Sequence, residues 1–395
     1  MGQSVFPAPS AGTTSQLPVG HAVVIADGTV ASGSSKTVTT TINPGTYSCM
    51  SNDGKVTFTF QPSGETVKPA AGWGITTKLV TTSQTSVAAT TPAAWTMTQS
   101  NTTNSGNYGF TVFKYGNGRA VGVNLGAATT THTTDGLNWT AGTVPASQNW
   151  NGVAFGNGVF VATAYGPSST AASSTDGITW TSRGMANSQH WTPTWYGGGK
   201  FVVAAWGPSS TGNYSTDGIS WSTSTMPNAD WYAGGYGNGV HIAVSGNTAT
   251  YTTSTDGITW TTRSFSSNIN AYGVAFGNGV FVVTSGNSTT YATSTDAINW
   301  TYRTSANQNG QNITFGGGYF FWPDYDTANL YTSTDGVNWT TRTMPQSSGY
   351  NTCTYMENVN AFVALRNSQT SNQAVRVEAP SNSSFGVYGG IQTIS

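Results

Sequence analysis

Carboxylates are the side chains in this chain best suited to general acid–base or metal chemistry, and six of the 14 fall into one repeated pattern. Six aspartates precede Gly-x-x-Trp, with alanine for glycine in one copy, and lie 39 to 41 residues apart: Asp135, Asp176, Asp217, Asp256, Asp296 and Asp335. Identical residues that recur along a chain cannot mark one unique site. We therefore expect these six carboxylates to be structural.

The remaining acids in the same region are Asp230, Asp324, Asp326, Glu357 and Glu378. A glycosidase needs two facing carboxyl groups, and Asp324 with Asp326 in PDYDTAN is the only close pair outside the repeat. We expect this pair to form a polar loop, which could serve as a weak cation site, rather than a catalytic pair. The histidines lack metal-ligand spacing, and no G-x-S-x-G, P-loop or Cys-x-x-Cys pattern occurs. The sequence thus predicts no enzyme, no metal and no cofactor.

A second motif shows which elements position the aspartates. FGNGVF and its variants begin at Tyr115, Phe155, Tyr196, Tyr236, Phe276 and Phe315, with a degenerate copy, YMENVNAF, at Tyr355. Asn-Gly between alternating apolar runs predicts a hairpin that joins strands a and b. The aspartate turn then joins strands c and d, and a tryptophan opens strand d: Trp139, Trp180, Trp221, Trp260, Trp300 or Trp339. Four strands in about 40 residues is the size of a β-propeller blade.

The chain contains seven hairpins and only six aspartate turns. AAWTMTQS around Trp95 is similar to the fourth strand at Trp339, yet three strands do not precede it. The segment from Cys353 to Val377 is similar to the first three strands of a blade without a fourth. Joining the two segments predicts an all-β, seven-bladed propeller over residues 91–378, closed by both chain ends so that no edge strand stays free.

These turns resemble the Asp-box, or sialidase-type BNR, repeat, in six copies over about 200 residues. The resemblance implies that each carboxylate accepts backbone N–H bonds and that each tryptophan packs between blades. A sialidase would also need three clustered arginines, a Tyr with a supporting Glu, and an acidic Asp. Four of the seven arginines here share one repeat position instead, at Arg183, Arg263, Arg303 and Arg342, and the Arg-Ile-Pro opening of that family is missing. A sialidase-like hydrolase using Asp324 or Glu357 is kept as an alternative.

Two further loops complete each repeat: one joins strand b to strand c, and the other joins strand d to strand a of the next repeat. They are expected on the face opposite the two motifs, differ between repeats and are rich in aromatic residues. We expect the ligand-binding residues among Trp150, Trp191, Trp231, Tyr272, Tyr350, Trp206, Tyr165 and Tyr325. His190 lies in a loop on the same face. Aromatic platforms beside Asn, Gln and Ser suit an uncharged carbohydrate. The alternative is that these aromatic residues only pack between blades.

Residues 1–90 lack both motifs and predict a small β-sandwich-like domain for attachment or oligomerisation. Its strand-like runs are HAVVIAD, KTVTTTI, GTYSCM, KVTFTFQ and GITTKLV, and TTSQTSVAATTPAA predicts a linker. Residues 379–395 are expected to form a C-terminal tail, either exposed or docked as a strand. Cys49 and Cys353 fall in different domains, and we expect two buried thiols without a disulfide.

Charged residues make up 7% of the chain and the formal net charge is −1. Without a basic cluster, nucleic acid and anionic membranes are poor partners, and the apolar runs are too short for membrane insertion. The N-terminus does not have the pattern of a secretory signal. This uncharged, Thr/Ser/Asn/Gly-rich composition resembles that of bacteriophage virion proteins such as tail fibres, spikes and capsid decorations.

We therefore expect a multicopy virion protein, assembled in the host cytoplasm, that binds other virion proteins through residues 1–90. Its propeller is expected to recognise a host-surface glycan. A purely structural capsid or tail decoration without ligand is the first alternative, and the sialidase-like glycoside hydrolase is the second.

Overall fold

The computed structural model describes residues 23–30, 35–42, 45–51, 56–61, 63–69, 76–80, 84–90, 95–102, 110–306, 309–346, 349–366, 373–380 and 383–389. These ranges contain strands and one short 3₁₀ turn, Glu357–Val359, so the fold is all-β. None of their helices is long and apolar enough to cross a membrane. The chain divides into a smaller unit, 1–94 with 380–395, and a larger unit, Trp95–Ala379.

The smaller unit contains two four-stranded antiparallel sheets. One has the order β1 (Val23–Val30), β35 (Ser383–Gly389), β3 (Gly45–Ser51), β6 (Thr76–Val80), and the other has the order β2 (Ser35–Ile42), β7 (Gln84–Thr90), β4 (Thr57–Gln61), β5 (Glu65–Val67). Phe58 and Phe60 of β4 are fully buried, and the Phe60 ring lies 6.3 Å from the Tyr47 ring of β3. The two sheets therefore pack against each other through aromatic side chains.

Two segments expected outside this unit are strands within it. β7 lies in the predicted linker but pairs with both β2 and β4, and Val87 is buried. The linker prediction is wrong for Gln84–Thr90, because this segment is paired on both sides and buries Val87 between the half-buried Ser86 and Ala88, as a central strand does. β35 lies in the predicted C-terminal tail and pairs with β1 and β3. The smaller unit is thus made from both ends of the chain, and the larger unit is inserted between β7 and β35.

The larger unit contains the strands of the repeats. They are β8 (Thr96–Asn101), β9 (Phe110–Gly116), β10 (Arg119–Asn124), β11 (Ala127–Thr133), β12 (Thr140–Gly156), β13 (Val159–Tyr165), β14 (Ser168–Ser174), β15 (Thr181–Gln189), β16 (Trp191–Gly197), β17 (Lys200–Ala205), β18 (Ser209–Ser215), β19 (Ser222–Ala229), β20 (Trp231–Gly237), β21 (Val240–Ser245), β22 (Thr250–Ser254), β23 (Thr261–Ser264), β24 (Ala271–Gly277), β25 (Val280–Ser285), β26 (Thr290–Ser294), β27 (Thr301–Thr304), β28 (Thr314–Gly316), β29 (Tyr319–Pro323), β30 (Asn329–Ser333), β31 (Thr340–Thr343), β32 (Tyr350–Met356), β33 (Ala361–Arg366) and β34 (Gln373–Glu378).

Each sequence repeat folds as an antiparallel sheet. Five sheets have four strands in the orders β16 to β19, β20 to β23, β24 to β27, β28 to β31, and β32-β33-β34-β8. β9 to β15 form one seven-stranded sheet, in which the long strand β12 pairs first with β11 and then with β13. β12 therefore ends repeat 1 and begins repeat 2, so part of the expected d–a loop is continuous strand.

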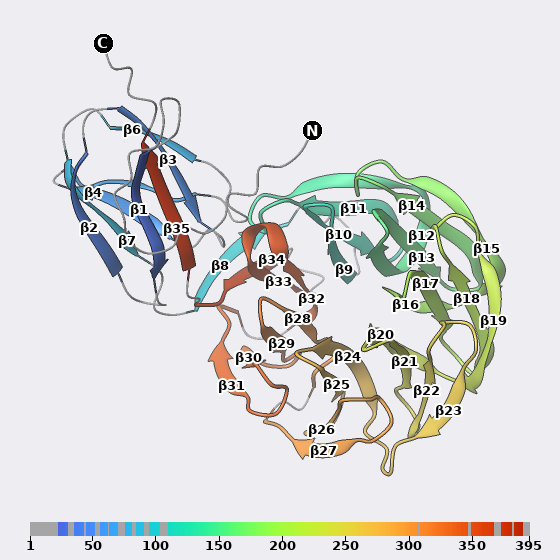
Figure 1. Ribbon diagram of the computed structural model, residues 1–395. Coiled ribbons are helices and arrows are strands. Elements are labelled where there is room, and N and C mark those ends of the chain that lie inside the picture. Colours follow the sequence, from blue (N-terminus) through green and yellow to red (C-terminus); the bar gives the residue numbers. More distant parts are fainter. Residues whose placement is uncertain are drawn as a thin grey trace. The chain divides into compact units, whose positions relative to one another are not determined.

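The first strands of the repeats lie side by side on the inner side of the arrangement in Figure 1. Each contacts the first strand of the next repeat, in the order β9, β12, β16, β20, β24, β28, β32, and β32 contacts β9. β8 pairs with β34, from Thr96 opposite Glu378 to Asn101 opposite Gln373. Just before β8, the Trp95 ring lies 4.3 Å beneath the Arg342 guanidinium of repeat 6. The segment before repeat 1 thus supplies the fourth strand of repeat 7.

Neighbouring repeats meet along a seam of glycine against aromatic rings. A Cβ added to the first glycine of each FGNG motif would overlap the ring that begins the motif of the next repeat. The pairs are Gly116–Phe155, Gly156–Tyr196, Gly197–Tyr236, Gly237–Phe276, Gly277–Phe315 and Gly316–Tyr355. These glycines are required by close approach of a neighbour, not by a left-handed backbone.

The hairpin asparagines add hydrogen bonds across the same seam. Asn117 and Asn278 adopt the positive φ that an Asn-Gly turn needs, and each donates its side-chain amide to a carbonyl of the next repeat. Asn117 Nδ2 lies 2.8 Å from the Thr175 oxygen, and Asn278 Nδ2 lies 2.8 Å from the Thr334 oxygen. Asn358 of repeat 7 makes the corresponding bond to Thr134 of repeat 1 at 2.7 Å. This bond connects repeat 7 to repeat 1.

The seam predicts that Gly156→Ala destabilises the larger unit, because the new methyl group overlaps the Tyr196 ring. We expect a loss of about 1–3 kcal/mol, the usual cost of overpacking a core, measured by chemical denaturation. Gly184→Ala on β15 is the matched control, because a Cβ there meets nothing within 4 Å. It should be neutral or stabilising by up to about 1 kcal/mol. Equal effects of the two substitutions would contradict the seam.

Candidate functional site

The repeated aspartates hold turns together. Asp256 Oδ1 accepts hydrogen bonds from the backbone N–H groups of Ile258 and Thr259 at 2.8 and 2.7 Å, and Ser254 Oγ donates to the same oxygen at 2.8 Å. Equivalent bonds occur in the other five turns. The backbone donor of Thr259 is the main reason that the pKa of Asp256 is lowered to about 2. These carboxylates are committed to their own turns, which is the arrangement that the Asp-box resemblance implies.

The tryptophans that follow these turns lie between sheets. Trp139 Nε1 donates to Ser100 Oγ of β8 at 3.0 Å, and Trp339 Nε1 donates to the Tyr291 hydroxyl of the preceding repeat at 3.0 Å. Trp180 is buried, and Trp221, Trp260 and Trp300 pack against hydrophobic clusters. They connect repeats rather than form a surface.

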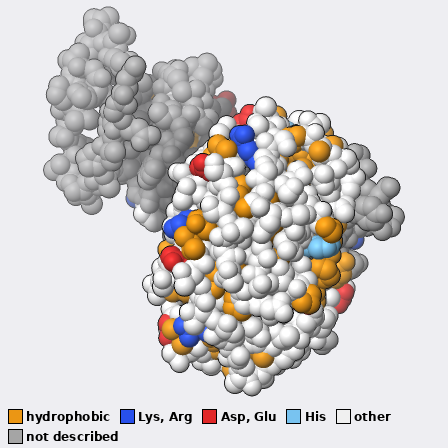
Figure 2. Space-filling model, turned by 90° about the vertical axis from the view of Figure 1, so that its right-hand side faces the viewer, with side chains coloured by type: hydrophobic (Ala, Val, Ile, Leu, Met, Phe, Trp, Pro, Cys, Tyr) orange, Lys and Arg blue, Asp and Glu red, His pale blue; other side chains and the backbone are white. Residues whose placement is uncertain are grey.

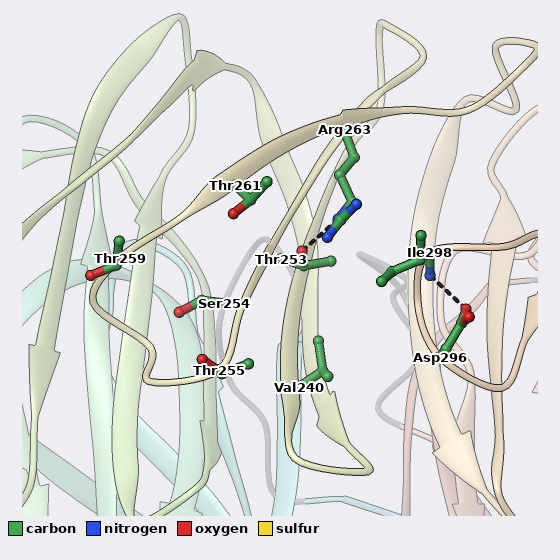
Figure 3. Close-up of a pocket in the computed structure, with 9 residues that line it drawn as sticks. All are labelled: Val240, Thr253, Ser254, Thr255, Thr259, Thr261, Arg263, Asp296 and Ile298. Carbon is green, nitrogen blue, oxygen red and sulfur yellow. Dashed lines mark hydrogen bonds between the residues drawn. The ribbon is translucent and has the colours of Figure 1, made fainter.

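A small pocket of about 230 Å³ lies between repeats 4 and 5 beside one of these turns (Figure 3). Arg263 points from β23 to Thr253 of β22, with its Nε 2.7 Å from Thr253 Oγ1, and Asp296 caps the neighbouring turn. The same Arg-to-hydroxyl bond recurs at Arg183, Arg303 and Arg342. Because its polar groups belong to the repeat, this pocket is not a distinctive site.

The low pKa of Asp256 predicts an acid-sensitive contribution to stability. The folded pKa lies below the ordinary value of 3.8, so the contribution is present above about pH 4 and is lost as the pH falls towards 2. We expect Asp256→Asn to be less stable than wild type at pH 7 and to approach it near pH 2, measured by thermal melting against pH. Asp326→Asn, which leaves every repeated turn intact, is the control. Parallel pH profiles of wild type and Asp256→Asn would contradict this role.

Four of the aromatic residues predicted to bind ligand are fully buried: Trp150, Trp191, Trp231 and Tyr350. Trp191 Nε1 donates to the Ser168 carbonyl at 2.8 Å, and burial raises the pKa of Tyr350 to about 12. The prediction of ligand contact is therefore wrong for these four, which fill the spaces between sheets. Trp191→Ala would remove core volume, at a typical cost of about 3–5 kcal/mol, and is not a test of binding.

A β-bulge explains this error. The pairing between first and second strands shifts directly after Trp150, Trp191, Trp231, Ala271 and Tyr350. Bulges re-aim side chains and are frequent beside binding sites. The unpaired residues at the shifts are Asn151, Thr192 with Pro193, Tyr232, Tyr272 and Asn351, and all of them line one cavity. The residue that lines the cavity is thus the one directly after the buried residue at each shift. Tyr272 therefore corresponds to Tyr232 of the preceding repeat and not to Trp231.

This central cavity has a volume of about 590 Å³. It is lined by residues from β9, β12, β16, β20, β24, β28 and β32, and so lies where the first strands meet. Each of these first strands is hydrogen-bonded on one side to the second strand of its own repeat. β12 is the exception, because its first half also pairs with β11 of repeat 1. Their inner backbone edges therefore offer N–H and C=O groups towards the cavity. The site is assembled from every repeat of the larger unit.

One side of the cavity is aromatic. Tyr165, Trp206, Tyr232 and Tyr272, which we call the aromatic arc, are half-buried and line it in succession over repeats 2 to 5. Ring centroids are 5.5 Å apart for Tyr165–Trp206, 6.4 Å for Trp206–Tyr232 and 4.6 Å for Tyr232–Tyr272. His190 lies 5.1 Å from Tyr165 at the edge of this group. Three of the residues predicted from sequence are therefore brought together, and Tyr232 is added.

Tyr325, the remaining predicted residue, does not line the cavity. It is half-buried in the PDYDTAN loop, where its backbone N–H donates to the Asn309 carbonyl at 3.0 Å. Asp324 in the same loop is buried, and its Oδ1 accepts the backbone N–H groups of Asp326 and Thr327 at 2.9 and 3.1 Å. Burial raises the pKa of Asp324, yet the carboxylate caps a turn.

The other side of the cavity is polar. Asn151, Gln311, Asn312 and Asn351 contribute amides, and Lys114 of β9 contributes an amine. Lys114 is exposed to the cavity, and loss of hydration inside the protein lowers its pKa. Sequence reasoning missed Lys114, because a single lysine in a strand gives no motif.

Cys353 lies beside Lys114 on the cavity wall. Burial raises the pKa of its thiol well above the usual range, and Sγ donates to Asn312 Oδ1 at 3.2 Å. Cys49 and Cys353 are both buried and form no disulfide.

Ionisable groups are sparse at this site. Among the described residues that line the cavity, Lys114, Cys353 and tyrosines Tyr165, Tyr232 and Tyr272 are the titratable ones, and none is Asp, Glu, His or Arg. No cluster of His, Cys, Asp or Glu in the described ranges fits a metal ion. Charged side chains are also sparse on the face of the larger unit that Figure 2 shows. The cavity combines apolar ring faces, neutral hydrogen-bonding groups and one amine.

Similar solved structures are β-propellers. Virginiamycin B lyase from Staphylococcus aureus has a TM-score of 0.63 at 10% identity, over 72% of this chain and 99% of that chain. YCF48 bound to a D1 peptide has a TM-score of 0.57 at 14% identity, over 76% and 97%. The WD40 β-propeller domain of Doa1 has a TM-score of 0.56 at 10% identity, over 72% and 97%. Identities this low establish the fold alone, and the chain contains a β-propeller.

Protein-family models and curated proteins both give no match to the sequence. The lyase shows that an enzyme shares this architecture, while a shared fold does not define a function.

Proposed function

We propose that the protein is a carbohydrate-binding propeller whose sugar site is the central cavity with its aromatic arc. The observation that carries the proposal is the β-bulge in successive first strands, which turns Tyr232, Tyr272, Asn151 and Asn351 towards one cavity. Sugars present apolar C–H faces that stack on aromatic rings and hydroxyl rims that bond amides. The arc comes from repeats 2 to 5, whereas Gln311, Asn312 and Asn351 face the cavity from repeats 6 and 7, so that rings and amides can contact different parts of one ligand.

The proposal includes a finer architecture of seven blades closed by both chain ends. Three observations support it: β8 pairs with β34, β32 contacts β9, and Asn358 bonds repeat 1 as the other hairpin asparagines bond their neighbours. Closure fixes the first strands around the cavity. A site composed of all the repeats needs this rigidity, because its side chains are far apart in sequence.

We further propose that the chain is a virion protein that binds host-surface glycan, with the smaller unit contacting other virion proteins. The support is compositional: 7% charged residues and an excess of Thr, Ser, Asn and Gly. Multiple copies would raise the weak affinity of a single sugar site by multivalency. A purely structural decoration without ligand is the competing proposal.

Binding of the purified full chain to a broad glycan array and to intact candidate host cells tests the proposal. We expect Trp206→Ala and Tyr272→Ala to weaken binding at least tenfold, about 1.4 kcal/mol, since each removes a stacking surface. Tyr214→Ala, on β18 and outside the described cavity lining, is the matched control, and thermal melting verifies folding of each variant.

If wild type binds a glycan and both cavity variants bind it equally well, the central cavity is not the binding site. A folded wild-type chain that binds no glycan and no cell would favour the structural decoration. Product analysis of any bound glycan tests hydrolysis, because an enzyme would release fragments that a binding protein leaves intact.

A further inference from the structure

We infer that the glycan recognised in the central cavity carries a singly charged acidic group, a carboxylate or a sulfate ester, and that Lys114 binds it. This inference rests on the proposed function and refines it, because the sequence alone predicts an uncharged carbohydrate. The juxtaposition that carries it is one amine and an aromatic arc lining the same cavity, whose other described lining groups are neutral.

The charge of Lys114 lacks a counter-ion at this site. None of the described lining residues is an acid. The nearby Cys353 thiol stays protonated, because burial raises its pKa and its Sγ donates to Asn312. Tyr165 and Tyr272 are neutral as well, since burial raises the pKa of both hydroxyl groups. A bound anion would supply the missing counter-ion, and its attraction to the amine is stronger in a cavity lined by protein than in bulk water.

The position of Lys114 suits a group on one edge of a sugar. Lys114 belongs to repeat 1, whereas the aromatic arc extends over repeats 2 to 5. Repeat 7, with Asn351 and Cys353, adjoins β9, where Tyr115 N donates to Thr354 Oγ1 at 3.2 Å. A sugar stacked on the arc would therefore direct its far edge towards the amine and the amides of repeats 6 and 7.

A single amine also restricts the charge of the ligand. A phosphate monoester carries nearly two charges at neutral pH, and one lysine would leave the second charge without a partner. Phosphate sites are usually built from several donors, such as backbone nests or arginine forks. One carboxylate or one sulfate ester is matched in charge by one Lys114.

The test compares oligogalacturonate, its methyl ester and a sulfated galactan as probes, together with uncharged glycans. The methyl ester preserves the size of the sugar and removes its charge, so we expect it to bind at least tenfold more weakly than the acid. Lys114→Gln should reduce binding of the acidic probes by the same factor and leave uncharged glycans unaffected, whereas Lys114→Arg should retain most of the binding. Lys36→Gln, an exposed lysine of β2 in the smaller unit, is the matched control for net charge.

Salt dependence gives a second readout. Affinity of the wild type for the acidic probe should fall as ionic strength rises, and affinity of Lys114→Gln should not. The inference would be overturned if the acid and its methyl ester bound equally, or if Lys114→Gln bound the acidic probe as tightly as wild type. Either result would leave the proposal of glycan binding in the cavity intact. A folded chain that binds neither acidic nor uncharged glycans would overturn the proposed function itself. Comparing the uronate with the sulfated galactan separates the two acidic groups.

Discussion

Close approach of neighbouring repeats is the constraint on which the rest of the larger unit depends. The aromatic ring at the start of each hairpin occupies the space that a Cβ would need on the preceding hairpin, so each repeat fixes the distance to the next one. The hairpin asparagine then bonds the following aspartate turn. The hairpin motif of one repeat thus contacts the aspartate-turn motif of the next. Because both motifs take part in this contact, both recur at a spacing close to 40 residues.

The close approach of neighbouring repeats occurs at the end of each first strand, at the hairpin glycine. The candidate site lies near the beginning of the same strands. Large buried side chains such as Trp150 and Trp231 fill the wider space there, and the bulge that follows each of them directs the next residue inward. The repeats can therefore differ in the bulged residue, Asn, Thr-Pro or Tyr, without changing how the sheets pack. A uniform scaffold thus supports a cavity with one aromatic side and one polar side.

The repeat made the propeller and the turn role of the aspartates predictable, since motifs at constant spacing report packing that is itself periodic. The cavity was predictable only in part. Trp150 and Trp191 were expected at the surface because loop composition does not distinguish a platform from interblade packing. A bulge shifts the side-chain alternation by one residue, and that shift leaves no sequence signal. Lys114 acquires significance from what surrounds it, which a sequence without the fold cannot show.

The insertion of the propeller into the smaller unit changes what residues 1–90 can be expected to do alone. β35 comes from the other end of the chain and lies between β1 and β3, so a fragment ending near Thr90 would lack a central strand and expose two unpaired edges. Removing residues 1–90 would in turn leave β35 without partners. Both connections of the propeller enter one small domain, which ties together the two segments that form β8 and β34. Loss of that domain would free the outer ends of both paired strands, so we expect the pairing of β8 with β34 to depend on the smaller unit.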